Sequence, residues 1–191
     1  MPDALRVAIV GAESTGKTAL AESLAGRLAQ QAGLRATWVP ELLREWCERE
    51  RRTPRIDEQA GLMRAQHERI DAAAANHDVV VCDTTALMTA VYSRIVFGDR
   101  SLDAAAVALH RSMSLTLLTS IDLPWVADGL QREGPHVRAP VDAALRELLS
   151  ASALPWTLIA GQGTERLASA WRSVAAITEQ RVSPGVGRAA R

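Results

Sequence analysis

Short apolar runs alternate along this chain with longer segments in which apolar residues recur every three or four positions. The short runs predict buried strands, and the longer period predicts helices with one buried face. The predicted strands span residues 5–10, 35–40, 78–83, 115–121 and 156–160. The predicted helices span 19–31, 41–51, 57–76, 84–97, 102–111 and 141–150, and the apolar stripe of a last helix is Leu167, Trp171, Val174 and Ile177.

The order of these elements predicts the fold class. Strands that alternate with helices are typical of a parallel sheet covered by helices on both faces. We therefore expect an α/β protein with a five-stranded parallel sheet, whose ligand lies at the carboxyl ends of the strands. One domain is expected over residues 1–182, with Asp57 as the N-cap of its third helix. The Gly/Pro/Arg-rich segment 183–191 is expected to be a disordered tail.

The segment between the first strand and the first helix carries the main chemical signal. Residues 11–18 read Gly-Ala-Glu-Ser-Thr-Gly-Lys-Thr and match the P-loop pattern G-x-x-x-x-G-K-[ST]. In this context the backbone N–H groups of the loop and of the helix start surround a phosphate, and glycine permits the positive φ that the loop needs. The predicted ATP site comprises Gly11, Glu13, Ser14, Thr15, Gly16, Lys17, Thr18 and Ala19, with Lys17 on the β/γ-phosphates and the Thr18 hydroxyl on Mg²⁺.

Lysine usage supports this interpretation and excludes one class of P-loop protein. Lys17 is the only lysine, and the other 21 of the 22 basic residues are arginines, so an ammonium is used where a compact cation must fit under a phosphate. A GTPase needs the base-reading motif N-K-x-D, which a chain with one lysine cannot contain. A motor or AAA-type ATPase is disfavoured because Thr84 follows Asp83, where a second acid is expected. A small-molecule kinase, which needs an acceptor pocket and a mobile lid, is favoured.

Two acids at predicted strand ends are candidates for the chemistry of such a kinase. Glu41 follows the second strand, where a carboxylate can orient the accepting hydroxyl and take its proton; an acid that stabilises a helix N-terminus is the equal alternative. Asp83 ends the third strand and is expected to hold Mg²⁺ directly or through water. The alternative for Asp83 is a strand-end turn or cap.

Loops near the same edge provide further candidates. Arg132 and Arg138 lie in the polar segment 122–139, where a lid could bring positive charge onto the transferring phosphate; a solvated basic loop is the alternative. Gly161 and Gly163 follow the fifth strand and are expected to form the loop that binds adenine through its backbone.

Composition limits the partners. The formal net charge is zero, so neither nucleic acid nor a membrane surface is expected as a partner. The two cysteines, Cys47 and Cys82, are far apart in the sequence, which fits a reducing cytoplasm. We expect neither an export signal nor a transmembrane span, since the chain has no apolar run of 18 residues. A homodimer is left open.

Four segments carry a resemblance to a known family. These are the P-loop, Glu41-x-x-Arg44-Glu45-Trp46, Cys82-Asp83-Thr84 and the segment Trp125-Val-Ala-Asp128-Gly-Leu-Gln-Arg132. Together they resemble the ribosylnicotinamide kinase domain of NadR-type proteins over roughly residues 5–175. The resemblance implies a nucleoside-kinase-like P-loop fold and ATP-dependent phosphorylation of nicotinamide riboside to nicotinamide mononucleotide. Thr85 stands at a position where an acid is common in relatives. Multidomain relatives also carry an adenylyltransferase domain, for which 191 residues are too few.

The physical chemistry of that substrate agrees with the residues in these segments. Nicotinamide riboside is a cation with a flat ring, so its pocket should offer carboxylates and aromatic faces, and cation–π stacking contributes about 0.5–2 kcal/mol. The predicted substrate-binding residues are Glu41, Arg44, Glu45, Trp46, Asp83, Trp125 and Asp128. Simple packing of Trp46 and Trp125 is the equal alternative. Specificity for another nucleoside or vitamin, or a regulatory ATP-binding module without catalysis, also stays open.

Overall fold

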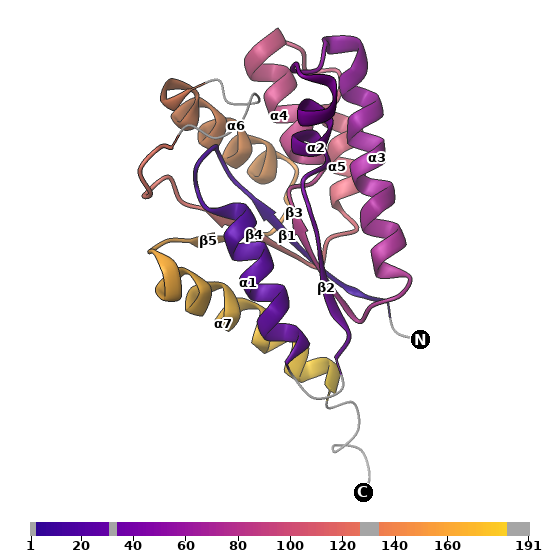
Figure 1. The fold of residues 1–191 in the computed structure, drawn as a ribbon, viewed down its shortest axis with the longest axis vertical. Helices are drawn as coiled ribbons and strands as arrows, with labels where there is room; N and C mark the ends of the chain where they lie inside the picture. The colour runs from indigo at the N-terminus through magenta and orange to yellow at the C-terminus, as the bar shows by residue number, and fades with distance from the viewer. Residues whose placement is uncertain (1–2, 31–33, 127–133, 183–191) are drawn as a thin grey trace, which may run out of the picture.

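The computed structural model describes residues 3–30, 34–126 and 134–182. Within these ranges the five strands β1 (Leu5–Val10), β2 (Ala36–Val39), β3 (Val79–Asp83), β4 (Leu115–Thr119) and β5 (Thr157–Ile159) form one sheet. The strand order is β2-β3-β1-β4-β5, and every neighbouring pair is parallel (Figure 1). The predicted five-stranded parallel sheet is confirmed.

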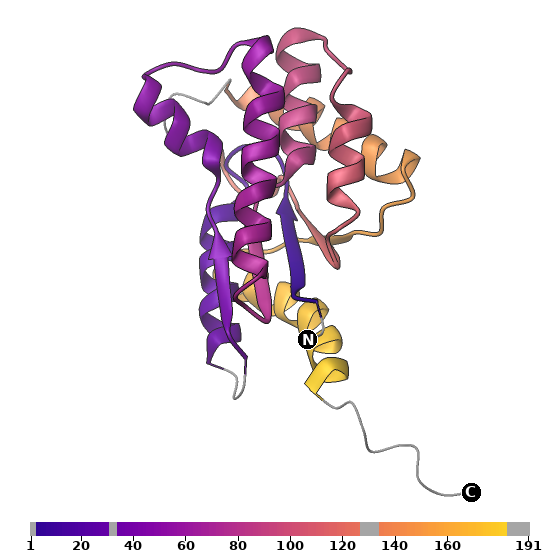
Figure 2. The same cartoon turned by 90° about the vertical axis from the view of Figure 1, so that its right-hand side faces the viewer.

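Helices cover both faces of this sheet (Figures 1 and 2). Helices α1 (Lys17–Ala29) and α7 (Gly163–Val182) lie on one face. The opposite face is covered by α3 (Ile56–Ala74), α4 (Ala86–Phe97), α5 (Asp103–His110) and α6 (Arg138–Ala151), with the short 3₁₀ helix η1 (Pro135–Val137) leading into α6. Helix α2 (Leu42–Glu50) follows β2 and packs against α3 near the carboxyl ends of the strands.

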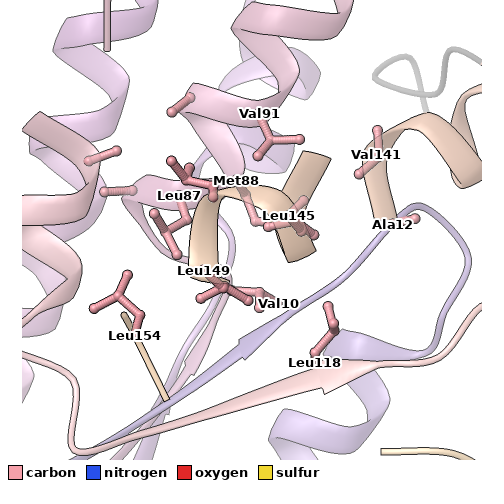
Figure 3. Close-up of a cluster of buried hydrophobic side chains, with 14 of the residues drawn as sticks. Val10, Ala12, Leu87, Met88, Val91, Leu118, Val141, Leu145, Leu149 and Leu154 are labelled. Carbon is pink, nitrogen blue, oxygen red and sulfur yellow. The ribbon is translucent and has the colours of Figure 1, made fainter. Parts of the chain in front are cut away.

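Successive residues of a strand point to opposite faces of the sheet, so each strand contributes to two hydrophobic cores, one on each face. In β1, Leu5, Val7 and Ile9 are fully buried against α1 and α7, whereas Val10 points to the other face and packs with α4 and α6. Figure 3 shows side chains of α4 and α6 converging on Val10 and on Leu118 of β4. Burial on both faces explains why the central strands are continuous apolar runs in the sequence.

Three local expectations differ from the structure. Asp57 is not an N-cap: α3 begins at Ile56, and the Glu58 carboxylate accepts the Arg55 N–H at 2.8 Å, which is the return bond of a capping box. Helix α4 begins two residues later than predicted, because Thr84 adopts a left-handed φ of 71° and the next residue is extended. Helix α6 begins at Arg138, so this residue belongs to a helix and not to the preceding loop.

Segments 127–133 and 183–191 lie outside the described residues, so the prediction of a disordered tail stays a prediction. Across the described ranges, no helix combines the length and apolar character needed to cross a bilayer.

Candidate active site

The P-loop connects β1 to α1 at the carboxyl edge of the sheet and takes the conformation that its glycines allow. Gly11 has φ of 156°, and a Cβ at this position would lie 2.1 Å from the Thr119 Oγ1 of the neighbouring strand β4. Gly16 has φ of 75° and immediately precedes α1. Glycine is therefore required at position 11 by close approach and at position 16 by backbone conformation.

Side chains inside the loop hold this conformation. The Lys17 ammonium donates a hydrogen bond to the Ala12 carbonyl at 2.8 Å, so that Lys17 lies back across the loop with 8% of its surface exposed. The Thr15 hydroxyl donates to the same carbonyl at 2.8 Å and lies 2.7 Å from the Thr119 hydroxyl. The loop is therefore ordered by its own residues and by β4, with Lys17 at the floor of the space above it.

Thr18 and Asp83 lie together, as expected for a metal pair. The Thr18 hydroxyl donates to Asp83 Oδ2 at 2.6 Å, and Asp83 is 1% exposed at the end of β3, next to β1 in the sheet. A hydroxyl and a carboxylate are hard oxygen donors of the type that Mg²⁺ uses in phosphoryl-transfer sites. The pair fits Mg²⁺ chemistry, and the part of the chain that the structure describes has no cluster of three or more His, Cys, Asp or Glu ligands elsewhere.

A cavity of about 710 Å³ opens above the loop. Its lining combines the P-loop with α2 and with the segment after β4: Ser14, Thr15, Gly16, Lys17, Thr18, Ala19, Glu22, Glu41, Arg44, Leu123, Pro124 and Val126. The predicted residues Glu41 and Arg44 thus share one cavity with the P-loop. Its size is in the range of small-molecule sites.

Glu41 lies where this cavity meets a second, much smaller one. The second space, of about 20 Å³, lies between α2, α3 and α4 and is lined by Glu41, Leu42, Leu43, Gln59, Leu62, Gln66, Thr84, Met88, Thr89 and Tyr92. Glu41 is the N-cap of α2 in position, but its side chain makes no capping hydrogen bond. Glu41 lines both cavities, and the first N–H of the helix is satisfied by Gln66, whose Oε1 accepts the Leu42 N–H at 2.7 Å.

The segment after β4 crosses the P-loop. The Ser14 hydroxyl donates to the Val126 carbonyl at 2.8 Å, and the Trp125 indole N–H donates to Glu13 Oε2 at 3.4 Å. The predicted lid residue Arg138 donates from Nη2 to the Leu123 carbonyl at 2.8 Å. Trp125 thus contacts the P-loop, and Arg138 contacts the segment beside it, of which Leu123, Pro124 and Val126 line the cavity. Asp128 and Arg132 lie outside the described residues.

Glu45 and Trp46 lie apart from the P-loop cavity. Glu45 pairs with Arg69 of α3 at 2.8 Å, and the Arg52 guanidinium lies 4.7 Å from the centre of the Trp46 ring. Both line a separate cavity of about 420 Å³ between α2 and α3. Their predicted role in substrate binding stays a prediction, and in this structure their charge and ring face are engaged by arginines.

The loop after β5 is connected to the P-loop through Arg166, which no sequence motif marks, and through Asp122, which follows β4 at the carboxyl edge of the sheet. Arg166 of α7 donates to the Thr15 carbonyl and to the Gly161 carbonyl, each at 2.7 Å, and pairs with Asp122. Both backbone groups of Gly161 are thereby used, because its N–H also donates to Asp122 Oδ2 at 2.8 Å. Among the predicted glycines, Gly163 begins α7.

The two cysteines and His110 are neutral at physiological pH. Burial raises the pKa of the Cys82 thiol to about 12 and that of Cys47 to about 11, so neither is a nucleophile. Burial lowers the pKa of His110 to about 4. Its neutral ring lies between the Thr85 hydroxyl at 3.0 Å and the Thr116 hydroxyl at 2.8 Å, joining the end of β3 to β4.

The sequence did not point to Arg166, Gln59 or Leu123. No local pattern marks them: Arg166 is one of many arginines in the chain, and Gln59 lies in a helix whose polar positions are mostly exposed. Only the fold brings α7 against the P-loop and turns this face of α3 toward Glu41.

Comparison with solved structures identifies the fold. The chain is similar to NadR protein in complex with NR (21% identity, TM-score 0.67, covering 92% of this chain and 52% of that chain). It is also similar to NadR protein in complex with NAD and AMP-PNP (20% identity, TM-score 0.69, 98% and 52% covered). Thymidylate kinase from Ehrlichia chaffeensis matches with 15% identity and a TM-score of 0.65, covering 93% of this chain and 100% of that one. The chain thus spans about half the length of the NadR structures.

These matches confirm the predicted P-loop kinase fold and the resemblance to NadR-type proteins at the level of the fold. No curated protein matches the chain. A family model described as an AAA domain matches residues 6–166. Motor ATPases also carry the AAA name, and the sequence disfavours that class because Thr84 follows Asp83. The similar solved structures named above are NadR proteins and a thymidylate kinase. Since the family model spans most of the chain, the protein belongs to this AAA-domain family.

Proposed function

We propose that this protein is an ATP-dependent kinase that phosphorylates the ribose 5′-hydroxyl of nicotinamide riboside to give nicotinamide mononucleotide. The observation that carries the proposal is the position of Glu41, a carboxylate residue that lines both the P-loop cavity and the small space between α2, α3 and α4. A phosphoryl donor on the P-loop and an acceptor in the second space would meet at this carboxylate. The similarity to NadR protein in complex with NR supports the choice of acceptor.

Each residue of the site has a role in this reaction. The backbone N–H groups of the P-loop and the Lys17 ammonium bind the phosphates of ATP. Thr18 and Asp83 would hold Mg²⁺, which neutralises charge on the phosphates when it is bound. Glu41 orients the 5′-hydroxyl and accepts its proton as the hydroxyl oxygen attacks the γ-phosphorus and ADP leaves. Arg138 donates to the carbonyl of Leu123, which lines the P-loop cavity, and its proposed role is to bring positive charge to the transferring group.

The acceptor space has the chemistry for a cationic ring with an amide substituent. Glu41 provides negative charge, Gln59 provides an amide that is 5% exposed, and Tyr92 provides an aromatic ring. Its volume of about 20 Å³ is near that of a single water molecule, so α2 or the side chains facing α3 must move to admit a nucleoside. Glu45, Trp46, Trp125 and Asp128 are additional proposed contacts of the bound acceptor.

The test is ADP release from ATP with a panel of acceptors, with product formation followed by chromatography. The panel contains nicotinamide riboside, its reduced uncharged form, cytidine, uridine, deoxyadenosine and thymidine monophosphate. Opposite charges at ~4 Å and an effective dielectric of ~20 gain about 4 kcal/mol, of which desolvation removes much. A net of about 1–3 kcal/mol predicts that nicotinamide riboside exceeds its reduced form by roughly 5- to 150-fold in kcat/KM. A higher kcat/KM for the reduced form, a pyrimidine nucleoside or the monophosphate would overturn the substrate assignment.

A matched variant separates chemistry from contamination in the same assay. Lys17→Arg keeps the net charge but replaces the compact ammonium with a planar guanidinium, and it should show no acceptor-dependent ADP release. ATP binding without phosphorylation of any panel member would instead favour a regulatory nucleotide-binding module.

A further inference from the structure

One arginine behind the site connects the two loops that would hold a nucleotide. Arg166 lies in the first part of α7 and is 3% exposed. Its Nη1 donates to the Thr15 carbonyl of the P-loop at 2.7 Å, its Nε donates to the Gly161 carbonyl at 2.7 Å, and its Nη2 pairs with Asp122 Oδ1. Each nitrogen of the guanidinium thus bonds to a different segment of the chain.

Asp122 completes the connection on the other side. Its Oδ1 accepts from Arg166, and its Oδ2 accepts the Gly161 N–H at 2.8 Å. The carboxylate therefore lies between the arginine and the backbone of the loop after β5. Only the arginine of this pair is deeply buried, with 4% of its side chain exposed against 33% for Asp122. Loss of Asp122 would therefore leave the Arg166 guanidinium buried without its charge partner.

The bond to Thr15 has a direct consequence for phosphate binding. A trans peptide unit is planar, so its carbonyl and the following N–H point in opposite directions, and the described residues contain no cis peptide bond. Because Arg166 draws the Thr15 carbonyl to the back of the loop, the Gly16 N–H of the same peptide unit points away from Arg166. Gly16 lines the P-loop cavity, where that N–H can meet a phosphate oxygen. Rotation of this peptide would instead present a carbonyl oxygen to the anion.

We propose that Arg166, with Asp122, is a positioning residue that sets the P-loop and the loop after β5 together for nucleotide binding. Arg166 acts from behind the loop, through the Thr15 and Gly161 carbonyls, and does not touch the reacting atoms. The inference rests on the proposed use of ATP but not on the identity of the acceptor. Loss of the arginine should therefore weaken ATP binding, while the acceptor site around Glu41, on the far side of β3, keeps its affinity.

The experiment compares Arg166→Lys and Arg166→Ala with the matched control Arg172→Lys. Arg172 lies on the same helix and is exposed, so this change tests loss of an arginine from α7 without loss of the contacts. Calorimetric titration measures the Kd of ATP and of inorganic triphosphate without an acceptor, and steady-state kinetics measures KM for each substrate. We expect the ATP Kd to rise at least tenfold in Arg166→Lys and the triphosphate Kd to rise as well. KM for the acceptor and the Arg172→Lys values should stay within twofold of wild type.

Chemical rescue protects the test against a folding defect. Guanidinium, added to Arg166→Ala far below concentrations that unfold the wild type, should restore ATP binding in part, whereas equal sodium chloride should not. Asp122→Asn should weaken ATP binding in the same direction. An ATP Kd within twofold of wild type in a folded Arg166→Lys, or absence of ATP binding by the wild type, would overturn the proposal. If ATP binding depends on Arg166 but the protein phosphorylates no acceptor, the positioning role of Arg166 is supported and only the proposed kinase activity is refuted.

Discussion

Replacing Glu41 with glutamine separates the two roles that are open to this carboxylate. As a helix-end acid, Glu41 would act on stability, because negative charge near a helix N-terminus contributes about 0.3–1 kcal/mol. As a general base it would act on the rate of transfer, and loss of such assistance typically costs a factor of about 10²–10⁴. The glutamine keeps the size of the side chain and removes its charge.

The structure indicates which of these two effects should be larger. Glu41 makes no capping hydrogen bond, and Gln66 already satisfies the first backbone N–H of α2 at 2.7 Å, so the role of Glu41 at the helix end is limited to the charge effect of about 0.3–1 kcal/mol. A loss of about 10²–10⁴ in kcat corresponds to about 2.7–5.4 kcal/mol in the activation barrier. The expected barrier change therefore exceeds the expected stability change several-fold.

The assay measures kcat at saturating ATP and acceptor together with the free energy of unfolding in urea. Glu48→Gln is the matched control, since Glu48 is exposed on the same helix and undergoes the same change of charge. We expect Glu41→Gln to lose at least a hundredfold in kcat with an unchanged Kd for ATP, and Glu48→Gln to resemble the wild type. A kcat within threefold of wild type, or an equal loss in both variants, would refute the role of Glu41 as base. If Asp83→Asn showed the acceptor defect instead, the roles of the two acids would be exchanged.

Four further outcomes are expected. Lys17→Arg should retain less than about a tenth of wild-type kcat, a barrier increase above roughly 1.4 kcal/mol. Gly11→Ala should lower ATP affinity and the melting temperature, because its Cβ would lie 2.1 Å from Thr119 Oγ1; a wild-type melting temperature would contradict this. Arg138→Ala should lower kcat more than it raises the acceptor KM, and kinetics within twofold of wild type would remove Arg138 from the reaction. Burial lowers the pKa of His110 to about 4, against a usual 6.5, so the unfolded chain binds the proton more tightly than the folded one. The free energy of unfolding should therefore fall by about 3 kcal/mol as the pH is lowered from 6.5 to 4. His110→Gln should reduce this dependence of stability on pH.

Local patterns were sufficient for the elements and for the phosphate loop. The β-branched run at 78–83 is typical of a buried strand. The P-loop needs glycine at position 11 because the backbone lies close to Thr119, and at position 16 because φ is positive there. Boundaries were less predictable. The left-handed Thr84 delays α4, and no residue type announces that conformation. Arg138 was predicted to lie in a polar loop, because the surrounding segment is polar, but α6 begins at this residue.

Contacts between distant segments could not be predicted from sequence, because they depend on how helices pack. Glu45 and Trp46 lie in the same motif as Glu41, yet Arg69 and Arg52 engage them on the far side of α2. A helix turns neighbouring residues to different faces, so membership of a motif does not imply membership of a cavity.

The strand order places Asp83 and Glu41 at the carboxyl edge of the sheet, at increasing distance from the P-loop. The P-loop follows β1, Asp83 ends β3 beside it, and Glu41 follows β2 one strand further out. Neighbouring strands are about 4.8 Å apart, so Glu41 leaves its strand about 10 Å from the strand that carries the P-loop. In the proposed reaction, that spacing would leave room for the terminal phosphate and its metal over Asp83 and for an acceptor hydroxyl next to Glu41. Because β3 lies between β1 and β2, its acid Asp83 is the one nearest the P-loop and the one that Thr18 contacts. The outer acid, Glu41, is the one that we propose acts on the acceptor.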